Sequence, residues 1–156
     1  MNDSKAAEMW DNRYSETGYA YGQDANEFLK ESVEHIPLGN VLCLGAGEGR
    51  NAVYLARQGF NVTAVDISEK GLAKARLLAK EDSVRINTIQ SDISEFRINK
   101  NHWHGIISIF FHTPPTLRKT IHRNIVSGLV PGGVFILEGY SQEQFEYKTG
   151  GNEFYF

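Results

Sequence analysis

Short apolar runs of strand length alternate with longer amphipathic stretches along most of the chain. The apolar runs occupy residues 41–44, 61–66, 84–90, 105–111 and 134–138. The amphipathic stretches occupy residues 6–14, 24–35, 52–58, 69–80 and 116–129. Strands that alternate with helices favour a parallel sheet with right-handed crossovers, so the pattern predicts an α/β, doubly wound fold.

The character of each run indicates where its strand lies in the sheet. Residues 105–111 are almost continuously apolar, which is typical of a central parallel strand covered on both faces. Residues 84–90 are only moderately apolar and suit an edge strand. Polar residues mark two helix starts: Asp24 with Glu27 predicts a capping box, and Ser68 predicts the cap of the helix at 69–80.

A glycine-rich turn, Gly45-Ala46-Gly47-Glu48-Gly49-Arg50, joins the first apolar run to the helical stretch that follows it. Glycine permits the reversal of the chain and lets a ligand approach the bare backbone. The first N–H groups of the helix remain as donors. The layout predicts a site for a nucleotide-like ligand, and the alternative is a tight turn without a ligand.

The spacing of these glycines favours a ligand smaller than a dinucleotide. A dinucleotide fingerprint reads G-x-G-x-x-G, whereas this turn reads G-x-G-x-G, and Arg50 takes the place of the third glycine. The Arg50 side chain would crowd a pyrophosphate on the helix start. The turn therefore suits a ligand that has an adenosine part and no phosphates.

A carboxylate at the end of the second apolar run strengthens this interpretation. Asp66 follows the glycine turn by about 20 residues, the distance at which an acidic side chain accepts ribose hydroxyls in nucleotide-binding folds. The alternative is that Asp66 caps the next helix, but Ser68 already stands where a cap is needed. We therefore predict that Asp66 binds a ribose.

Three ordered motifs resemble those of the S-adenosylmethionine (SAM) dependent methyltransferases with a Rossmann-like sheet. They are residues 44–51, 63–68 and 129–134, and the segments 10–14 and 19–22 resemble the small bacterial branch of the tellurite-resistance type. The likeness covers roughly residues 9–151. It implies a strand order of 3-2-1-4-5, SAM as the cofactor, in-line methyl transfer and a small-molecule acceptor.

The resemblance also implies roles for individual residues. The segment 1–23, a helix followed by a tyrosine-rich loop, would close over the methionine part of SAM, with Arg13 meeting its carboxylate; packing of the loop on the domain is the alternative. Asp92 would bind the adenine amino group and Ile93 would pack on the ring, with a helix cap as the alternative for Asp92. The predicted cofactor-binding residues are Arg13, Tyr21, Gly45, Ala46, Gly47, Arg50, Asp66, Ile67, Asp92, Ile93 and Phe110.

The acceptor is expected at the end of the fourth strand, where His112 stands before Thr113 and two prolines. His112 is a candidate for orienting or deprotonating the nucleophile; a structural or substrate-packing histidine is the alternative. His102 and His104 lack the spacing of a zinc site, so we predict solvated loop histidines and no metal.

Composition narrows the remaining classes of function. The 156 residues fit a single domain that ends in a short tail, residues 140–156. The net charge of −3, with acidic and basic residues mixed, gives no electrostatic footprint for nucleic acid or an anionic membrane. Cys43, the single cysteine, lies in the first apolar run, so we predict that it is a core residue with a free thiol. A free cysteine fits a protein of the reducing cytoplasm. No 18-residue apolar run or signal peptide appears in the sequence.

The sequence departs from the resembling family at its end, because strands six and seven of that family have no counterpart here. The strand at 134–138 should then expose an unpaired edge. We predict a homodimer through this strand and the tail, with Phe154 or Phe156 in the interface; pairing of residues 153–156 with the strand is the alternative. The short end also leaves open a catalytically inactive SAM-binding module, and a nicotinamide-dependent oxidoreductase is a further alternative.

Overall fold

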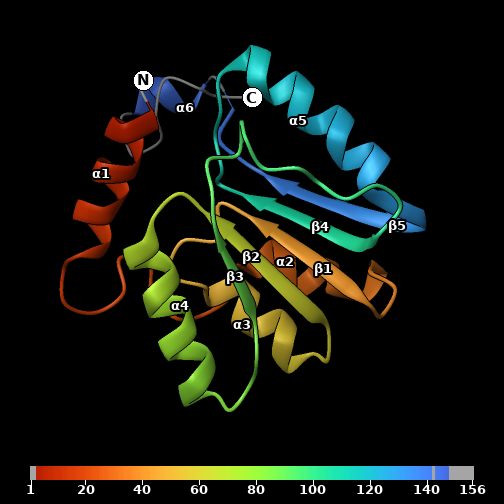
Figure 1. The fold of residues 1–156 in the computed structure, drawn as a ribbon, viewed down its shortest axis with the longest axis horizontal. Helices are drawn as coiled ribbons and strands as arrows, with labels where there is room; N and C mark the ends of the chain where they lie inside the picture. Colours follow the sequence, from red (N-terminus) through yellow and green to blue (C-terminus); the bar gives the residue numbers. More distant parts are fainter. Residues whose placement is uncertain (1–2, 142, 148–156) are drawn as a thin grey trace.

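A five-stranded parallel sheet forms the centre of the protein in the computed structural model, which describes residues 3–141 and 143–147. The strand order is β3-β2-β1-β4-β5, and every neighbouring pair is parallel (Figure 1). This confirms the predicted fold class and strand order. The strands are β1 (Asn40–Leu44), β2 (Asn61–Asp66), β3 (Asn87–Gln90), β4 (Trp103–Ile109) and β5 (Leu129–Glu138).

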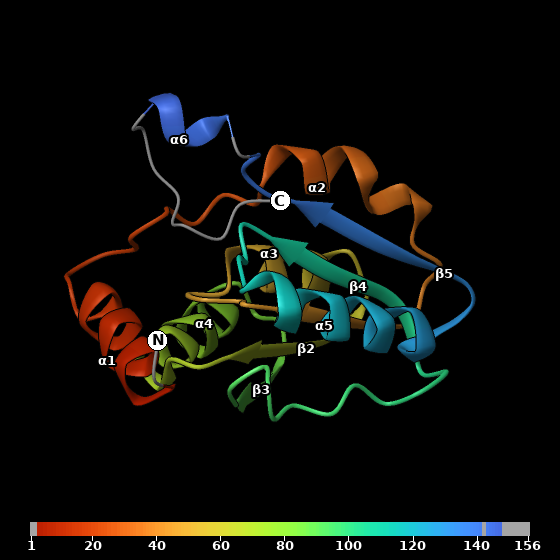
Figure 2. The same ribbon diagram turned by 90° about the horizontal axis from the view of Figure 1, so that it is seen from above.

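Helices cover both faces of the sheet (Figures 1 and 2). One face packs on α2, α3 and α4 through a core that includes Leu29, Leu55 and Leu72. The other face packs on α5 through Ile121 and Ile125. The helices are α1 (Asp3–Tyr14), α2 (Glu27–Ser32) with a 3₁₀ turn (Val33–His35), α3 (Arg50–Arg57), α4 (Glu69–Glu81), α5 (Pro115–Gly128) and α6 (Gln144–Tyr147).

Alternate residues of the central strands serve the two faces. On β1, Val41 and Cys43 face the α2–α3 side, whereas Leu42 and Leu44 face α5. All four side chains are buried, as expected for a parallel strand between two helical layers. Burial raises the pKa of the Cys43 thiol to about 12, so this thiol is a core group rather than a nucleophile.

Several element boundaries differ from those predicted. The strand β3 begins only at Asn87, and β4 ends at Ile109, so Phe110 and Phe111 lie outside the sheet. Asp24 does not cap α2: the cap is Asn26, whose side chain accepts the Leu29 N–H at 2.9 Å. The predicted capping box is therefore wrong. The cap predicted at Ser68 is confirmed, because its hydroxyl accepts the Gly71 N–H at 3.0 Å.

The strand β5 forms one edge of the sheet, since within the described residues it pairs only with β4. Its register shifts between Trp103 and Gly105 of β4, where the Pro131-Gly132-Gly133 sequence lies opposite. Phe154 and Phe156 lie outside the described residues, so the predicted dimer remains a prediction. Within the part of the chain that the structure describes, no helix has the length and apolar character needed to cross a membrane.

Candidate functional site

The turn that follows β1 has a backbone conformation that favours glycine at three positions. The φ angles of Gly45, Gly47 and Gly49 are 62°, 54° and 86°, all in the left-handed region. Gly49 stands at the N-cap of α3 and supplies no side chain to cap it. The helix begins at Arg50, two residues before the predicted start, so its N-terminus points toward the turn as the sequence predicted.

The space beside all three glycines is filled by side chains of the protein itself. A Cβ at Gly45 would overlap the Phe111 ring, a Cβ at Gly49 would overlap Ala75 of α4, and a Cβ at Gly47 would lie 2.7 Å from the Tyr14 hydroxyl. The sequence predicted that glycines stand here so that a ligand can approach the backbone. The structure gives a second reason for glycine at these positions, because α4 and the end of α1 pack directly on the turn and leave no space for a side chain.

Asp66 ends β2 and ties the turn to the next helix. Its Oδ2 accepts the Gly47 N–H at 2.7 Å, and its Oδ1 accepts the Ser68 N–H at 2.9 Å. The residue is only 8% exposed. Burial raises the pKa of Asp66, and the hydrogen bonds from backbone N–H groups oppose that rise. Each carboxylate oxygen has a second lone pair, so Asp66 retains the capacity to accept two hydroxyl groups.

The end of α1 lies over this part of the site. Tyr14 is buried, and its ring also packs on Gly71 at the start of α4. The Ser68 hydroxyl donates to Asp11 Oδ1 at 2.5 Å. The N-terminal helix thus packs against the end of β2 and the start of α4, beside the predicted ribose-binding carboxylate.

Arg13 and Tyr21 lie together on the outer side of the loop that follows α1. The Arg13 guanidinium stands 5.5 Å from the centroid of the Tyr21 ring and pairs with Glu16 at 3.7 Å. Arg50 reaches the same loop, with Nη1 3.4 Å from the Tyr21 carbonyl oxygen and 3.3 Å from that of Asp24. In this arrangement Arg50 holds the loop, and the Arg13 side chain is 45% exposed and accessible to a ligand carboxylate.

Asp92 and Ile93 follow β3 at the same end of the sheet. Asp92 Oδ1 accepts the Ser94 N–H at 2.7 Å, which caps the turn that ends at Phe96. Ile93 is half-buried against the core on the α5 face. This geometry agrees with the alternative that Asp92 caps a turn, and the adenine-binding role remains a prediction.

Phe110 leaves β4 with an unusual backbone. Its φ is 52°, in the left-handed region that disfavours aromatic residues, and its N–H donates to the Glu138 carbonyl at 2.8 Å. The Phe110 ring is 38% exposed and lies 4.8 Å from the Tyr140 ring, centroid to centroid. The end of β4 therefore carries an aromatic pair of exposed Phe110 and half-buried Tyr140 where the acceptor was expected.

His112 joins the segments that follow β4 and β5. Its Nε2 accepts the Tyr140 N–H at 3.0 Å, and the two rings stack with centroids 5.5 Å apart. Burial lowers the pKa of His112, a hydrogen bond with the Phe110 backbone opposes that fall, and the charge of Arg118 adds to it. Because Nε2 already accepts a backbone N–H, the geometry supports a structural role for His112 more directly than that of a general base.

The lowered pKa of His112 predicts that acid destabilises the fold. The unfolded histidine, with a pKa of about 6.5, binds a proton more readily than the folded one. The free energy of unfolding should therefore fall as the pH drops through 6.5 and level off below the folded pKa. Urea denaturation between pH 7.5 and about pH 5 measures the slope.

His112→Gln should reduce this slope while leaving an acceptor for the Tyr140 N–H. Burial also lowers the pKa of His122, so His122→Gln is a matched control that removes a different share of the slope. An unchanged pH dependence in His112→Gln would show that His112 does not carry the effect.

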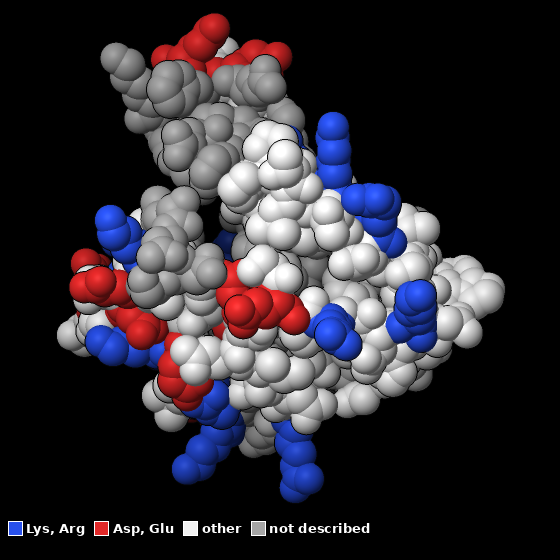
Figure 3. Space-filling model, turned by 45° about the horizontal axis from the view of Figure 1, so that its top comes forward, with Lys and Arg blue, Asp and Glu red and all other residues white. Residues whose placement is uncertain are grey.

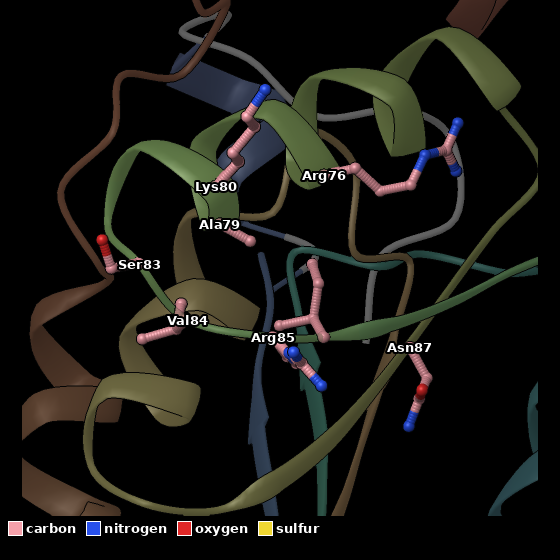
Figure 4. A pocket seen from close by; sticks show the side chains of 8 residues that line it. Arg76, Ala79, Lys80, Ser83, Val84, Arg85 and Asn87 are labelled. Atoms are coloured by element: carbon pink, nitrogen blue, oxygen red, sulfur yellow. The ribbon is translucent and has the colours of Figure 1, made fainter.

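One hollow in the surface lies away from these residues. It occurs where α4 ends and β3 begins, so it opens at the opposite end of the sheet from the glycine turn. Arg76, Lys80 and Arg85 line it, but in Figure 4 their side chains do not converge on one point. On the face shown in Figure 3, basic side chains are scattered among acidic and uncharged ones. The described residues contain no cluster of His, Cys, Asp and Glu side chains able to hold a metal.

The sequence did not single out two polar links that help form the site. Glu48, between two glycines of the turn, is buried and pairs with Lys74 of α4. Asn26 Nδ2 donates to Glu138 Oε2 at 2.6 Å, and Asn51 Oδ1 accepts the Asn26 N–H at 2.9 Å. A charged residue inside a tight apolar turn was the one signal for Glu48; nothing in the local sequence indicated the Asn26–Glu138 contact.

Comparison with known proteins gives matches over most of this architecture. The methyltransferase domain family matches residues 41–133, which contain the glycine turn, Asp66, Asp92 and His112. A protein of Rickettsia canadensis named ubiquinone biosynthesis O-methyltransferase is 33% identical over 111 residues, 70% of this chain and 46% of the relative. The chain spans about half the length of the relatives that it matches.

Two solved structures share the fold at moderate sequence identity. The PH0226 protein from Pyrococcus horikoshii has a TM-score of 0.68 and 26% identity, covering 78% of this chain and 56% of that one. TehB from Haemophilus influenzae has a TM-score of 0.67 and 25% identity, covering 86% of this chain and 46% of that one.

Proposed function

The chain belongs to the methyltransferase domain family, and from this premise we propose that the protein is a SAM-dependent methyltransferase that acts on a small molecule. SAM is its cofactor and supplies an electrophilic methyl group when bound. The observation that carries the proposal is the link between Asp66 and the glycine turn, in which one carboxylate accepts the Gly47 N–H and keeps lone pairs for a ribose.

The donor and acceptor groups of the site fit SAM. Asp66 is the acceptor for two ribose hydroxyls, and the open N-terminus of α3 supplies donors with no phosphate to bind. The exposed guanidinium of Arg13 matches a carboxylate through paired N–H groups. Asp92 and Ile93 lie after β3, beside Asp66 at the end of β2, where the adenine would be bound.

Alignment of the nucleophile with the methyl carbon, and exclusion of water, supply most of the acceleration in such a transfer. The loop after α1 encloses one side of the site, and the aromatic pair Phe110 and Tyr140 borders the other. His112 fixes this pair by accepting the Tyr140 N–H. The protein thus contributes binding and orientation to the transfer.

An oxygen nucleophile is the first acceptor class to test, because the Rickettsia relative is named an O-methyltransferase. An alcohol or phenol must release a proton as the O–CH₃ bond forms, whereas a thiolate or a chalcogen oxyanion need not. The likeness to TehB keeps the tellurite-resistance branch as part of this proposal. The homodimer and the cytoplasmic location expected from the sequence likewise remain predictions.

The methyltransferase relatives do not favour the two alternatives, an inactive SAM-binding module and a nicotinamide-dependent oxidoreductase. Ligand binding and turnover together distinguish the methyltransferase from both alternatives. We expect SAM and S-adenosylhomocysteine, but not NAD, to raise the melting temperature. We also expect acceptor-dependent formation of S-adenosylhomocysteine, followed by mass spectrometry, with a panel of alcohols, phenols, thiols and chalcogen oxyanions. Binding of SAM without turnover of any acceptor would favour the inactive module, and a shift with NAD alone would overturn the proposal.

A further inference from the structure

We propose that Lys74 and Glu48 are positioning residues that hold the loop of residues 15–23 against the glycine turn and so enclose the methionine end of SAM. This inference rests on the proposed function for its ligand. The contacts that form the link rest on the structure alone.

Lys74 gathers three acceptors around one ammonium group. Its Nζ donates to the carbonyl oxygens of Glu16 at 2.8 Å and Gly18 at 2.5 Å, and to Glu48 Oε1 at 2.8 Å. An ammonium group has three N–H donors, so these acceptors use its full capacity. The same ammonium lies 5.7 Å from the centroid of the Tyr19 ring.

Glu48 completes the link from the side of the turn. One carboxylate oxygen accepts from Lys74, and Oε2 accepts the Ala20 N–H at 2.7 Å. The Glu48 side chain is 4% exposed and that of Lys74 is 22% exposed, so water competes little for this pair. Charge-assisted hydrogen bonds of this kind are short and roughly twice as strong as neutral ones.

The loop has few other attachments to the domain. Within the described residues its remaining polar ties to α3 and α4 are Lys70 with the Ser15 hydroxyl at 2.6 Å, and two long contacts, Arg50 with the Tyr21 carbonyl at 3.4 Å and the Tyr19 hydroxyl with the Lys74 carbonyl at 3.5 Å. The Tyr19 ring also packs on the apolar cluster between α3 and α4. Most of the other side chains of the loop are exposed. The Lys74–Glu48 pair is therefore the central polar attachment of the loop.

The position of Glu48 couples the loop to the cofactor site. Glu48 lies between Gly47, whose N–H donates to Asp66, and Gly49, the N-cap of α3. A displacement of the turn would move the Glu48 carboxylate away from Ala20 and Lys74. The conformation that presents the ribose carboxylate is thus the one that closes the loop beside Arg13 and Tyr21.

Lys74→Met tests the proposal by removing the ammonium while keeping the length of the side chain. Without the ammonium, hydrogen exchange at the Ala20 amide should accelerate about tenfold or more, measured with no ligand present. The dissociation constant for SAM should rise about tenfold, while that for adenosine, which has no methionine part, changes less than about twofold. Lys74→Arg should restore most of the SAM affinity.

Lys80→Met is the matched control, because Lys80 is an exposed lysine near the C-terminal end of α4, and within the described residues no hydrogen bond or ion pair joins its side chain to the loop. Lys80→Met should change neither the exchange rate at the Ala20 amide nor the dissociation constant for SAM. If Lys74→Met does not fold because Glu48 is left unpaired, the double variant Lys74→Met with Glu48→Gln removes both charges and permits the same comparison.

Unchanged exchange at Ala20 in the folded variant would overturn the proposal. Equal losses of SAM and adenosine affinity would also overturn it, since they indicate general support of the fold. If the wild-type protein binds no SAM, the proposed function fails and the methionine-enclosing role fails with it. The exchange result would then still decide whether the pair holds the loop.

Discussion

Asp66→Ala should weaken SAM binding by about tenfold to several hundredfold. Two hydrogen bonds from ribose hydroxyls to a carboxylate contribute roughly 1.5–3 kcal/mol each, and every 1.4 kcal/mol is about a factor of ten in affinity. The structure adds a second effect, because the variant also leaves the N–H groups of Gly47 and Ser68 without their acceptor. Since an unsatisfied buried donor costs about 1–3 kcal/mol, the free energy of unfolding should fall by roughly 2 kcal/mol or more.

Titration calorimetry on protein shown to be folded by circular dichroism measures the affinity, and urea denaturation measures the stability. Asp66→Asn retains one acceptor oxygen and the shape of the side chain, so its stability should lie between those of the wild type and Asp66→Ala. Asp82→Ala is a control, because Asp82 is a partly exposed carboxylate at the end of α4 whose one ion pair within the described residues is with Arg57. Wild-type affinity in folded Asp66→Ala would contradict the ribose assignment.

Removal of residues 1–23 should leave a folded domain that binds SAM about tenfold to more than a hundredfold more weakly. The paired hydrogen bonds between the Arg13 guanidinium and the methionine carboxylate are lost with the segment, and each contributes roughly 1.5–3 kcal/mol. The sheet and its two cores remain, since within the described residues the segment supplies only Tyr14 to the set of buried apolar residues. Adenosine affinity should change much less than SAM affinity.

Two smaller changes separate binding from support of the fold. Arg13→Ala removes an exposed guanidinium and should weaken SAM binding without affecting adenosine or the melting temperature. Removal of residues 1–8 keeps the part of α1 that contains Asp11, Arg13 and Tyr14 and should affect neither ligand. If the full deletion weakens adenosine and SAM equally, the segment supports the domain rather than meeting the carboxylate.

The sequence predicted the turn between β1 and α3 well because its signals are local. Three glycines at alternate positions, an apolar run before them and a helical stretch after them are all read within a few residues. The left-handed φ angles of Gly45, Gly47 and Gly49 agree with that prediction. The sequence could not predict which side chains lie beside Gly47 and Gly49, because these are Tyr14 and Ala75, which are distant from the turn in the sequence.

Element ends were predicted less well where a distant partner determines them. Phe110 has a φ of 52° and donates its N–H to the Glu138 carbonyl, and β4 stops two residues before the end of the apolar run at 105–111. Asn26 caps α2 in place of Asp24, and its amide also donates to Glu138 at the end of β5. Both contacts join residues that only the completed sheet brings together.

The sequence by itself determined the order of strands and helices, the glycine turn and the carboxylate of Asp66, because periodicity and turn chemistry act over a few residues. The tertiary structure alone decided what these parts touch. In the folded protein Tyr14 lies over the turn, His112 Nε2 accepts the Tyr140 N–H, and Glu48 pairs with Lys74. Such contacts depend on how α1, α4 and the strand ends pack in space, and this packing of distant segments leaves no periodic signal in a single sequence.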